Sequence, residues 1–171
     1  MEQNIVQVEN TQPAFVHLHV HSEYSLFDGA IRIKDLIRKA EKLGHKAIAL
    51  TDHGNLFAAI EFYTKAKAAG IKPILGCEIF CEASNFSKEL IKSGKISTET
   101  KPEYFHLVLL AKNIQGYKNL LKIVSAGYTE GLGAVPVVPR AVLEKHQDGL
   151  ICLSACGLGE LGFLVQSLRQ H

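Results

Sequence analysis

Short apolar runs alternate with amphipathic helical patterns along this chain, and that alternation constrains its fold more than any other feature. Strands are predicted at residues 15–20, 46–50, 72–80, 105–111 and 150–154, and helices at 33–43, 56–69, 113–127 and 160–170. The runs 47–50 and 107–110 are apolar at every position, which is typical of strands buried on both faces. We therefore expect an α/β fold with a mainly parallel sheet covered by helices, either open or closed into a barrel.

Helix boundaries and two unpatterned segments complete this organisation. Asn55 is predicted to cap the second helix, and Gly70 to end it. Residues 1–13 are polar and are predicted to form an N-terminal extension, so that the domain spans 14–171. Residues 83–103 are mostly polar and show neither the alternation of a strand nor the spacing of a helix. We expect a surface insertion there in preference to a lid or a mobile segment.

The composition bounds the class of protein. The 171 residues, 47% of them hydrophobic, can bury one core, but no apolar run is long enough to span a membrane. The first residues lack the pattern of a secretory signal, so we expect a cytoplasmic protein with no membrane partner. The net charge of +2 does not by itself require a nucleic-acid partner.

Side chains that can bind metal gather where the predicted strands end. In the stretch His17-Leu18-His19-Val20-His21 the imidazoles share one strand face, so His19 and His21 should point the same way. The carboxyl ends of parallel strands meet at one rim, which brings distant residues together. The candidate ligands are His19, His21, Asp28, His53, Glu78, His106 and Cys156.

Some neighbours of these residues compete with them for the same role. Asp52 and His53 point in different directions if their strand continues, and we favour His53 as the ligand and Asp52 as a turn or supporting group. Cys77 and Glu78 compete in the same way, and Glu78 is favoured. His17 lies further from the rim, where a structural role is favoured.

The remaining cysteines and histidines are expected to have no specific role. Two Cys-x-x-x-Cys pairs, Cys77 with Cys81 and Cys152 with Cys156, invite a four-cysteine zinc site, but both begin inside apolar strands, where a free cysteine acts as a small hydrophobe. Disulfides are not expected in a cytosolic chain. The histidines without a predicted role are His45, His146 and His171.

The mixture of imidazole, carboxylate and thiol donors is too large for one tetrahedral ion, so two or three divalent ions are expected. Closely spaced ions can activate water and hold the oxygens of a phosphate ester, and the pattern therefore favours phosphoester hydrolysis. No motif for a serine or cysteine nucleophile and no phosphate-binding glycine loop is present.

The chain resembles the polymerase-and-histidinol-phosphatase (PHP) superfamily. The motifs that carry the resemblance are His19-Val20-His21-Ser22, Asp28-Gly29, Thr51-Asp52-His53-Gly54 and Gly76-Cys77-Glu78. Residues 15–29, 71–78, 106–113 and 116–120 are similar, more narrowly, to the PHP domains at the amino terminus of bacterial DNA polymerase III α subunits. The resemblance extends from residue 14 to about residue 168.

This resemblance implies a distorted barrel of about seven strands with nine metal ligands. Residue by residue it supplies the same seven ligands, for two or three ions of Zn, Mn, Fe or Mg. The other two come from an Asp-x-His motif on a later strand, which the 171 residues lack. We therefore expect the first part of a PHP barrel, incomplete and, as a fragment, inactive.

The resemblance leaves three functions open. The first is a domain of a DNA polymerase α subunit, a nucleotidyltransferase, whose metal site hydrolyses phosphodiesters as a 3′–5′ proofreading exonuclease. Its partners would be DNA, bound through the full polymerase, and other subunits such as the proofreading exonuclease subunit and the sliding clamp. The alternatives are a structural or docking module for the polymerase and a stand-alone PHP phosphoesterase.

Overall fold

The computed structural model describes residues 15–94, 104–131 and 135–168, and the predicted extension at 1–13 and His171 lie outside these ranges. The helices are α1 (Ile33–Lys42), α2 (Ala59–Ala68), α3 (Asn85–Lys92), α4 (Ile114–Thr129), α5 (Arg140–Lys145) and α6 (Glu160–Leu168). The strands are β1 (Ala47–Leu50), β2 (Lys72–Cys81), β3 (Phe105–Ala111), β4 (Val137–Val138) and β5 (Leu150–Leu153). The predicted α/β class is confirmed.

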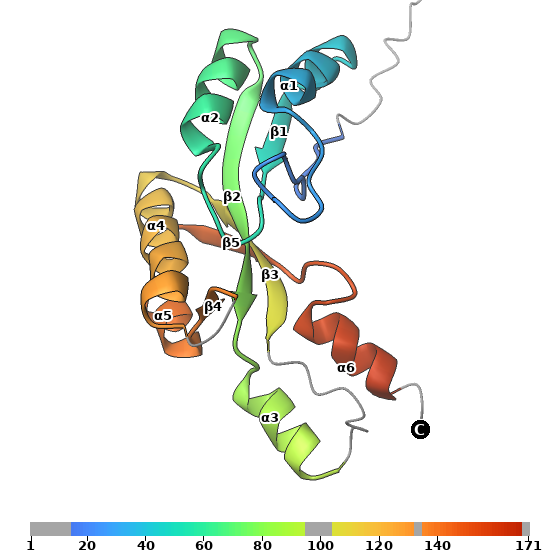
Figure 1. Cartoon of the computed structure of the whole chain (residues 1–171), viewed down its shortest axis with the longest axis vertical. Helices are drawn as coiled ribbons and strands as arrows, with labels where there is room; N and C mark the ends of the chain where they lie inside the picture. Colours follow the sequence, from blue (N-terminus) through green and yellow to red (C-terminus); the bar gives the residue numbers. More distant parts are fainter. Residues whose placement is uncertain (1–14, 95–103, 132–134, 169–171) are drawn as a thin grey trace, which may run out of the picture.

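The five strands form one sheet in the order β1-β2-β3-β5, with β4 added beside β2 (Figure 1). β2 is the longest strand and the centre of the sheet, parallel to β1 and β4. β3 runs antiparallel to both β2 and β5. Among the described residues the sheet is open, with β1 at one edge and β5 at the other.

The prediction of a mainly parallel sheet was therefore wrong for β3. An apolar run shows that a strand is buried but carries no information about its direction. The connection from β2 to β3 contains α3, which lies beyond the end of β2 (Figure 1), and the chain re-enters the sheet at that same end. A connection that returns at the same end of the sheet makes an antiparallel pair.

The predicted strand at 15–20 is an extended segment and not a regular strand. It lies beside β1, where the Ala49 amide donates to the His17 carbonyl and the Thr51 amide donates to the Val20 carbonyl. The two bonds are two residues apart on the side of β1 and three residues apart on the segment. The Val20 amide donates to the Thr51 hydroxyl at 2.9 Å, so a side chain takes the place of a main-chain partner. This mismatch breaks the regular ladder while keeping the segment against the sheet.

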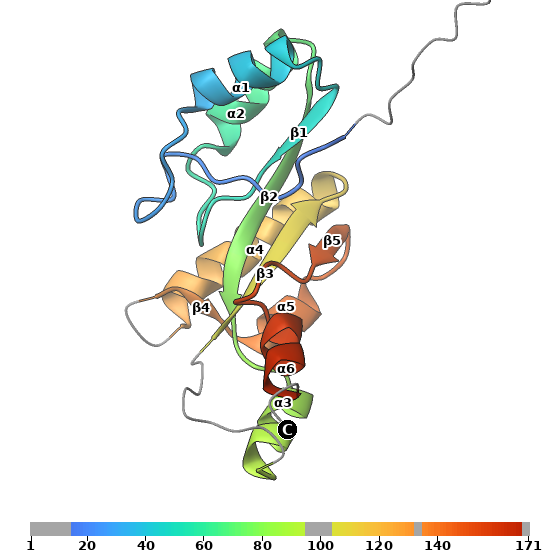
Figure 2. The same ribbon diagram turned by 90° about the vertical axis from the view of Figure 1, so that its right-hand side faces the viewer.

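Three hydrophobic cores lie on the sheet; the two larger ones lie along β2, and the third contains Ala49, Val108 and Leu110. The first packs α1 and α2 against β1, as Figure 2 shows at the upper end of the molecule, and contains Ile33, Ile37 and Phe62. The second packs α4 against β2 and β3, with Cys77, Ile79 and Cys81 on the same side of β2. Because side chains alternate along a strand, Glu78 and Phe80 emerge on the opposite face of the sheet, away from α4.

Local structure differs from prediction in several places: β4 and α5 were not predicted, and two further segments differ. Residues 83–103 were expected to be a loop, but Asn85–Lys92 form α3, whose first turn is capped by Ser84, with its hydroxyl accepting from the Ser87 amide at 3.2 Å. Asn55 does not cap α2, whose N-cap is Ala58. The Asn55 side chain instead accepts from the Phe57 amide at 3.1 Å and donates to the Tyr24 carbonyl at 3.0 Å. Asn55 therefore fixes the turn that precedes the helix.

Candidate metal centre

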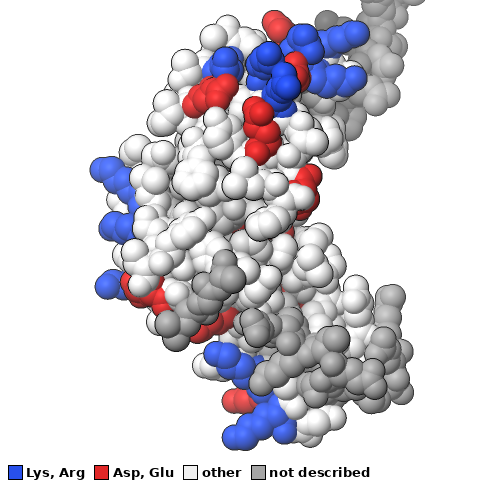
Figure 3. Space-filling view, viewed as in Figure 1, with Lys and Arg blue, Asp and Glu red and all other residues white. Residues whose placement is uncertain are grey.

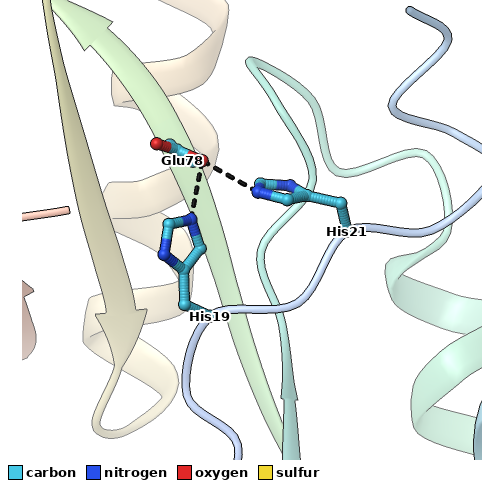
Figure 4. Close-up of side chains that lie close together, drawn as sticks. All are labelled: His19, His21 and Glu78. Carbon is cyan, nitrogen blue, oxygen red and sulfur yellow. Dashed lines mark hydrogen bonds and ion pairs between the residues drawn. The ribbon is translucent and has the colours of Figure 1, made fainter. Parts of the chain in front are cut away.

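Four imidazoles surround the carboxylate of Glu78, which is 1% exposed at the middle of β2. Its Oε2 lies 2.7 Å from His19 Nε2 and 3.0 Å from His21 Nε2 (Figure 4), and 3.4 Å from His53 Nδ1. Its Oε1 lies 2.8 Å from His106 Nδ1. One buried carboxylate thus joins nitrogens from four separate positions of the chain.

His19 and His21 come from the extended segment beside β1 and point to the same carboxylate oxygen, as Figure 4 shows. The prediction that these two side chains share a direction is confirmed. Leu18 and Val20 alternate with them, and Val20 packs against the first core. Val20 therefore holds the segment against the domain while the two imidazoles face Glu78.

His53 extends the cluster to Asp28. His53 Nε2 lies 3.1 Å from Asp28 Oδ2, while its other nitrogen faces Glu78. The main chain beyond β1 continues alongside β2, since the Glu78 amide donates to the Asp52 carbonyl and the Gly54 amide donates to the Glu78 carbonyl. This pairing sets His53 level with Glu78, and the prediction that His53 and Asp52 point in different directions is confirmed.

His106 reaches the cluster by a route that the predicted rim of parallel strands does not provide. It is the second residue of β3 and pairs with Phe80 in the antiparallel ladder. His106 therefore lies near the amino end of its strand, and Glu78 lies within β2 and not after it. The expectation that the ligands follow the carboxyl ends of parallel strands was wrong for these two residues, because the reversed strand brings His106 to the same place from the opposite direction.

Asp52 organises the loops that carry the other residues. It is 2% exposed, and its carboxylate accepts from the Ser22 amide at 2.6 Å, the Ser22 hydroxyl at 2.8 Å and the Ser25 hydroxyl at 2.7 Å. The Ser25 hydroxyl in turn accepts from the His53 amide at 3.1 Å. The supporting role predicted for Asp52 fits these contacts. Ser22 and Ser25 were not identified from the sequence. They could have been found by asking which nearby hydroxyls donate to Asp52, because a buried carboxylate needs hydrogen-bond donors.

The turn between Ser22 and Asp28 depends on Gly29. The Asp28 and Gly29 amides both donate to the Ser25 carbonyl, which closes the turn tightly. A β-carbon on Gly29 would lie only 1.8 Å from the Ser22 carbonyl oxygen. Only glycine fits this position, and the close approach sets where Asp28 stands relative to His53.

The electrostatics of the cluster favour an ionised Glu78. Burial alone would raise the pKa of this carboxyl, but hydrogen bonds from His106, His21 and His19 outweigh burial and hold the pKa well below its ordinary value. For His21, burial lowers the pKa and the contact with Glu78 raises it, with a net increase. The cluster therefore combines one buried, ionised carboxylate with partly exposed imidazole side chains.

The donor set fits divalent cations. His19, His21 and Glu78 present one atom each within 4.8 Å of one another, and so do His53, Glu78 and His106. Within the described ranges, the buried Nδ1 atoms of His21 and His53 have no hydrogen-bond partner. A buried nitrogen without a partner costs free energy that a cation can recover. Two groups that share Glu78 support a metal site for more than one ion.

The seventh predicted ligand, Cys156, belongs to neither group of donors. It is exposed and lies in the turn after β5, which is attached to β3 where the His106 amide donates to the Leu158 carbonyl at 3.1 Å. Its role as a ligand stays a prediction. His17 is not in the cluster either, since its ring packs against Phe15 and His45.

The described cysteines do not form a four-cysteine zinc site. Cys77 and Cys81 are buried in the second core, while Cys152 and Cys156 are exposed. Burial raises the pKa of the Cys81 thiol to about 11, and it raises that of Cys77 further, so both remain protonated. The Cys77 thiol donates to the Asp52 carbonyl at 3.2 Å. This placement agrees with the choice of Glu78 over Cys77.

Fold and site together define a metal-binding α/β domain whose donors surround one carboxylate of a central strand. The family described as "PHP domain" matches residues 17–170, and the chain therefore belongs to the PHP family. None of the described helices is long and apolar enough to cross a membrane.

The chain is also similar to parts of much longer proteins. It is 54% identical over 156 residues to "DNA polymerase III subunit alpha" of Borreliella burgdorferi, which covers 91% of this chain and 13% of that protein. The protein of the same name from Treponema pallidum is 46% identical over 159 residues, which covers 92% of this chain and 13% of that protein. A solved structure from Bifidobacterium adolescentis superposes with a TM-score of 0.45 at 18% identity, covering 67% of this chain and 33% of that one. The chain thus spans about one eighth of the length of these polymerase subunits.

Proposed function

We propose that this chain is the N-terminal part of the PHP domain of a DNA polymerase III α subunit. In the complete protein its cluster would bind two or three divalent cations, Zn, Mn, Fe or Mg, to hydrolyse phosphodiesters. The observation that carries the proposal is the cluster of four imidazoles around Glu78, with Asp28 joined to it through His53, in a chain similar to proteins named for DNA polymerase III. The proposed ligands are His19, His21, Asp28, His53, Glu78 and His106, with Cys156 as the seventh. DNA and the other polymerase subunits would be the partners.

The reaction class proposed is removal of the 3′-terminal nucleotide of a DNA strand. Water forms a new bond to phosphorus, the bond from phosphorus to the 3′ oxygen of the preceding nucleotide breaks, and that oxygen takes up a proton. When bound, divalent cations supply activation of water and neutralise charge on the phosphate. The chain itself contributes an ionised, buried Glu78, imidazoles fixed against it, and the turn fastened by Asp52 that positions Asp28.

Substitution of the cluster in the complete gene product tests the proposal. Asp28→Asn removes the negative charge of one candidate ligand and His53→Ala removes one imidazole. We expect less bound metal per chain and loss of hydrolysis of a 3′-labelled single-stranded oligonucleotide, while nucleotide incorporation stays measurable. His45→Ala is the matched control, because His45 donates to the Phe15 carbonyl outside the cluster. Exonuclease activity that survives in both variants would refute the proposal.

A structural or docking role is the second candidate, and exposed apolar side chains favour it. Ile151, Leu158, Leu161 and Val165 are between 46% and 63% exposed on β5, the turn after it and α6. Apolar surface of this kind suits contact with further protein. In this role metal would add only stability. Chelation that lowers the melting temperature of the complete protein and removes no hydrolysis would favour it over the exonuclease.

A further inference from the structure

An aromatic pocket of about 460 Å³ opens beside the metal centre. Its walls include Asp28, His53 and His106 from the cluster, so the pocket and the centre share residues. It also has six phenyl or phenol side chains, those of Tyr24, Phe27, Phe57, Phe80, Tyr104 and Tyr128. The volume falls within the range of ligand pockets, roughly 300–1,000 Å³.

The aromatic rings continue directly from the candidate ligands. Phe80 lies almost parallel to His53, with centroids 5.9 Å apart and an angle of 11° between the rings. It also meets His106 edge-on at 5.0 Å and Tyr104 at 5.1 Å. Phe80 therefore lies between the imidazoles and the outer part of the pocket. It is on the face of β2 that carries Glu78.

Three of the rings are left uncovered at the outer part of the pocket. Phe27 is 105% exposed, Phe57 is 69% exposed and Tyr128 is 57% exposed, and they come from three separate segments. Phe27 immediately precedes Asp28 in the turn fastened by Asp52, so it is presented beside the centre. Large aromatic side chains left in water on several converging segments are typical of a surface that binds a ligand.

The charges around the pocket indicate what kind of ligand fits. Among its described lining residues there is no lysine or arginine, and Asp28 is the acidic residue. Figure 3 shows basic side chains mainly at the two ends of the molecule and along the margin formed by α4. A pocket without cationic side chains does not suit a phosphate, but its rings suit a flat, neutral group that can stack on them.

We propose that the aromatic pocket binds the base of a nucleoside phosphate whose phosphate lies at the metal centre. This inference rests on the proposed phosphodiester hydrolysis and names the part of the substrate recognised besides the phosphate. Base–aromatic stacking tolerates every base, because each has a flat face, so the pocket would select for the presence of a base and not for its identity.

Binding of thymidine 5′-monophosphate and of deoxyribose 5-phosphate, which lacks the base, tests the proposal. Both are titrated calorimetrically into the complete protein loaded with Mn²⁺. We expect the base to strengthen binding about tenfold, and this preference to disappear in Phe27→Ala and Phe57→Ala. Phe27→Tyr should retain it, because the ring remains. The matched control is Phe86→Ala, since Phe86 is 62% exposed on α3 and does not line the pocket.

A second arm separates a free nucleotide from a strand end. Initial rates of hydrolysis are compared for oligonucleotides that end in thymidine or in an abasic residue, and a preference for thymidine that is lost in Phe27→Ala indicates that the pocket receives the 3′ end of a strand. A base preference in calorimetry without one in hydrolysis assigns the pocket to free nucleotides. Equal binding of the two small ligands, or a preference unchanged in both alanine variants, overturns the proposal.

The two proposals can fail separately. If the protein hydrolyses thymidine and abasic ends equally, binds both small ligands equally and loses hydrolysis in Asp28→Asn, the exonuclease stands and the base pocket is refuted. If it binds thymidine 5′-monophosphate with a base preference but hydrolyses no oligonucleotide, the pocket stands and the exonuclease is refuted.

Discussion

The buried carboxylate of Asp52 binds both the main-chain amide and the hydroxyl of Ser22, at 2.6 Å and 2.8 Å. Ser22 directly follows His21, so this double contact fixes the residue after a candidate ligand. A third bond, from the Ser25 hydroxyl, extends the same hold to the turn that leads to Asp28. Asp52 thus positions side chains on both sides of the cluster without being one of the donors that face Glu78.

Asp52→Asn is expected to lower both stability and metal affinity. An amide can accept through only one oxygen, so at least one buried donor of Ser22 or Ser25 loses its partner, and the free energy of unfolding should fall by about 2–4 kcal/mol. Displacement of the two loops should weaken metal binding by roughly 10- to 100-fold. Denaturant unfolding without metal measures the first effect, and metal titration measures the second.

Asp35→Asn provides the control for this substitution. Asp35 is exposed on α1 and pairs with Arg38 at 2.8 Å, so its loss should change stability by less than about 0.5 kcal/mol. If Asp52→Asn behaves like Asp35→Asn in both measurements, Asp52 does not organise the centre.

Gly29→Ala should disrupt the turn that carries Asp28. The added β-carbon would collide with the Ser22 carbonyl oxygen, so the main chain must move, and we expect a loss of about 1–3 kcal/mol in stability together with weaker metal binding. Gly157→Ala is the comparison, because the nearest atom to its added carbon is 3.6 Å away. Thermal unfolding of the two variants should separate them clearly, and equal melting temperatures would contradict this account of the turn.

Glu160 should make stability depend on pH in the acid range. Burial raises the pKa of its carboxyl, but hydrogen bonds from Ser87 and Ser84 and the charge of Arg140 lower it to a net value below the ordinary 4.5. A depressed folded-state pKa stabilises the protein above the unfolded value, and this contribution is lost as pH falls through the folded value. Glu160→Gln should therefore cost about 1 kcal/mol near pH 7 and progressively less below about pH 4.5.

Melting temperatures of wild type and Glu160→Gln between pH 7 and pH 3 measure this contribution. Glu144→Gln is the control, because Glu144 is 68% exposed and lies 3.8 Å from the same Arg140. A gap between wild type and Glu160→Gln that stays constant with pH would show that the carboxylate charge is not what stabilises α6.

Alkylation should distinguish the cysteines. Iodoacetamide reacts with thiolates, and the buried, protonated Cys77 and Cys81 should react only after unfolding, whereas the exposed Cys156 should react in the folded protein. If Cys156 is a metal ligand, loading with Zn²⁺ should slow its modification at least severalfold. Peptide mass spectrometry reads each site, and modification of Cys156 at the same rate with and without metal would remove it from the ligand set.

Local patterns in the sequence predicted the parts of the site that depend on neighbouring residues. The period of two along 17–21 is sufficient to direct His19 and His21 the same way, and the same alternation separates His53 from Asp52 and Glu78 from Cys77. The predicted helix at 113–127 also begins at the right place, since Asn113 is the N-cap of α4 and its side chain accepts from the Gly116 amide at 2.9 Å. The α/β class follows from the same periodicities.

The relations between distant segments could not be predicted in this way. The direction of β3 depends on where the chain returns after α3. The apolar run 107–110 does not indicate this direction. His106 was identified as a candidate, but its approach to Glu78 from an antiparallel strand was not. The aromatic pocket was also missed, because Phe27, Phe57 and Tyr128 lie far apart in the chain and belong to no motif.

The length of β2 has a consequence for how the domain unfolds. Its first half adjoins the core of α1 and α2, where Leu75 packs, and its second half belongs to the core of α4, with Glu78 between Cys77 and Ile79. His19 and His21 stand beside the first core, and His106 belongs to the strand that the second core covers. Cations shared among these residues would link the two cores, which are otherwise joined by β2 and by the buried cluster of Ala49, Val108 and Leu110. Cooperativity between the two halves should then be a property of the loaded protein, and it should weaken when the metal is withdrawn.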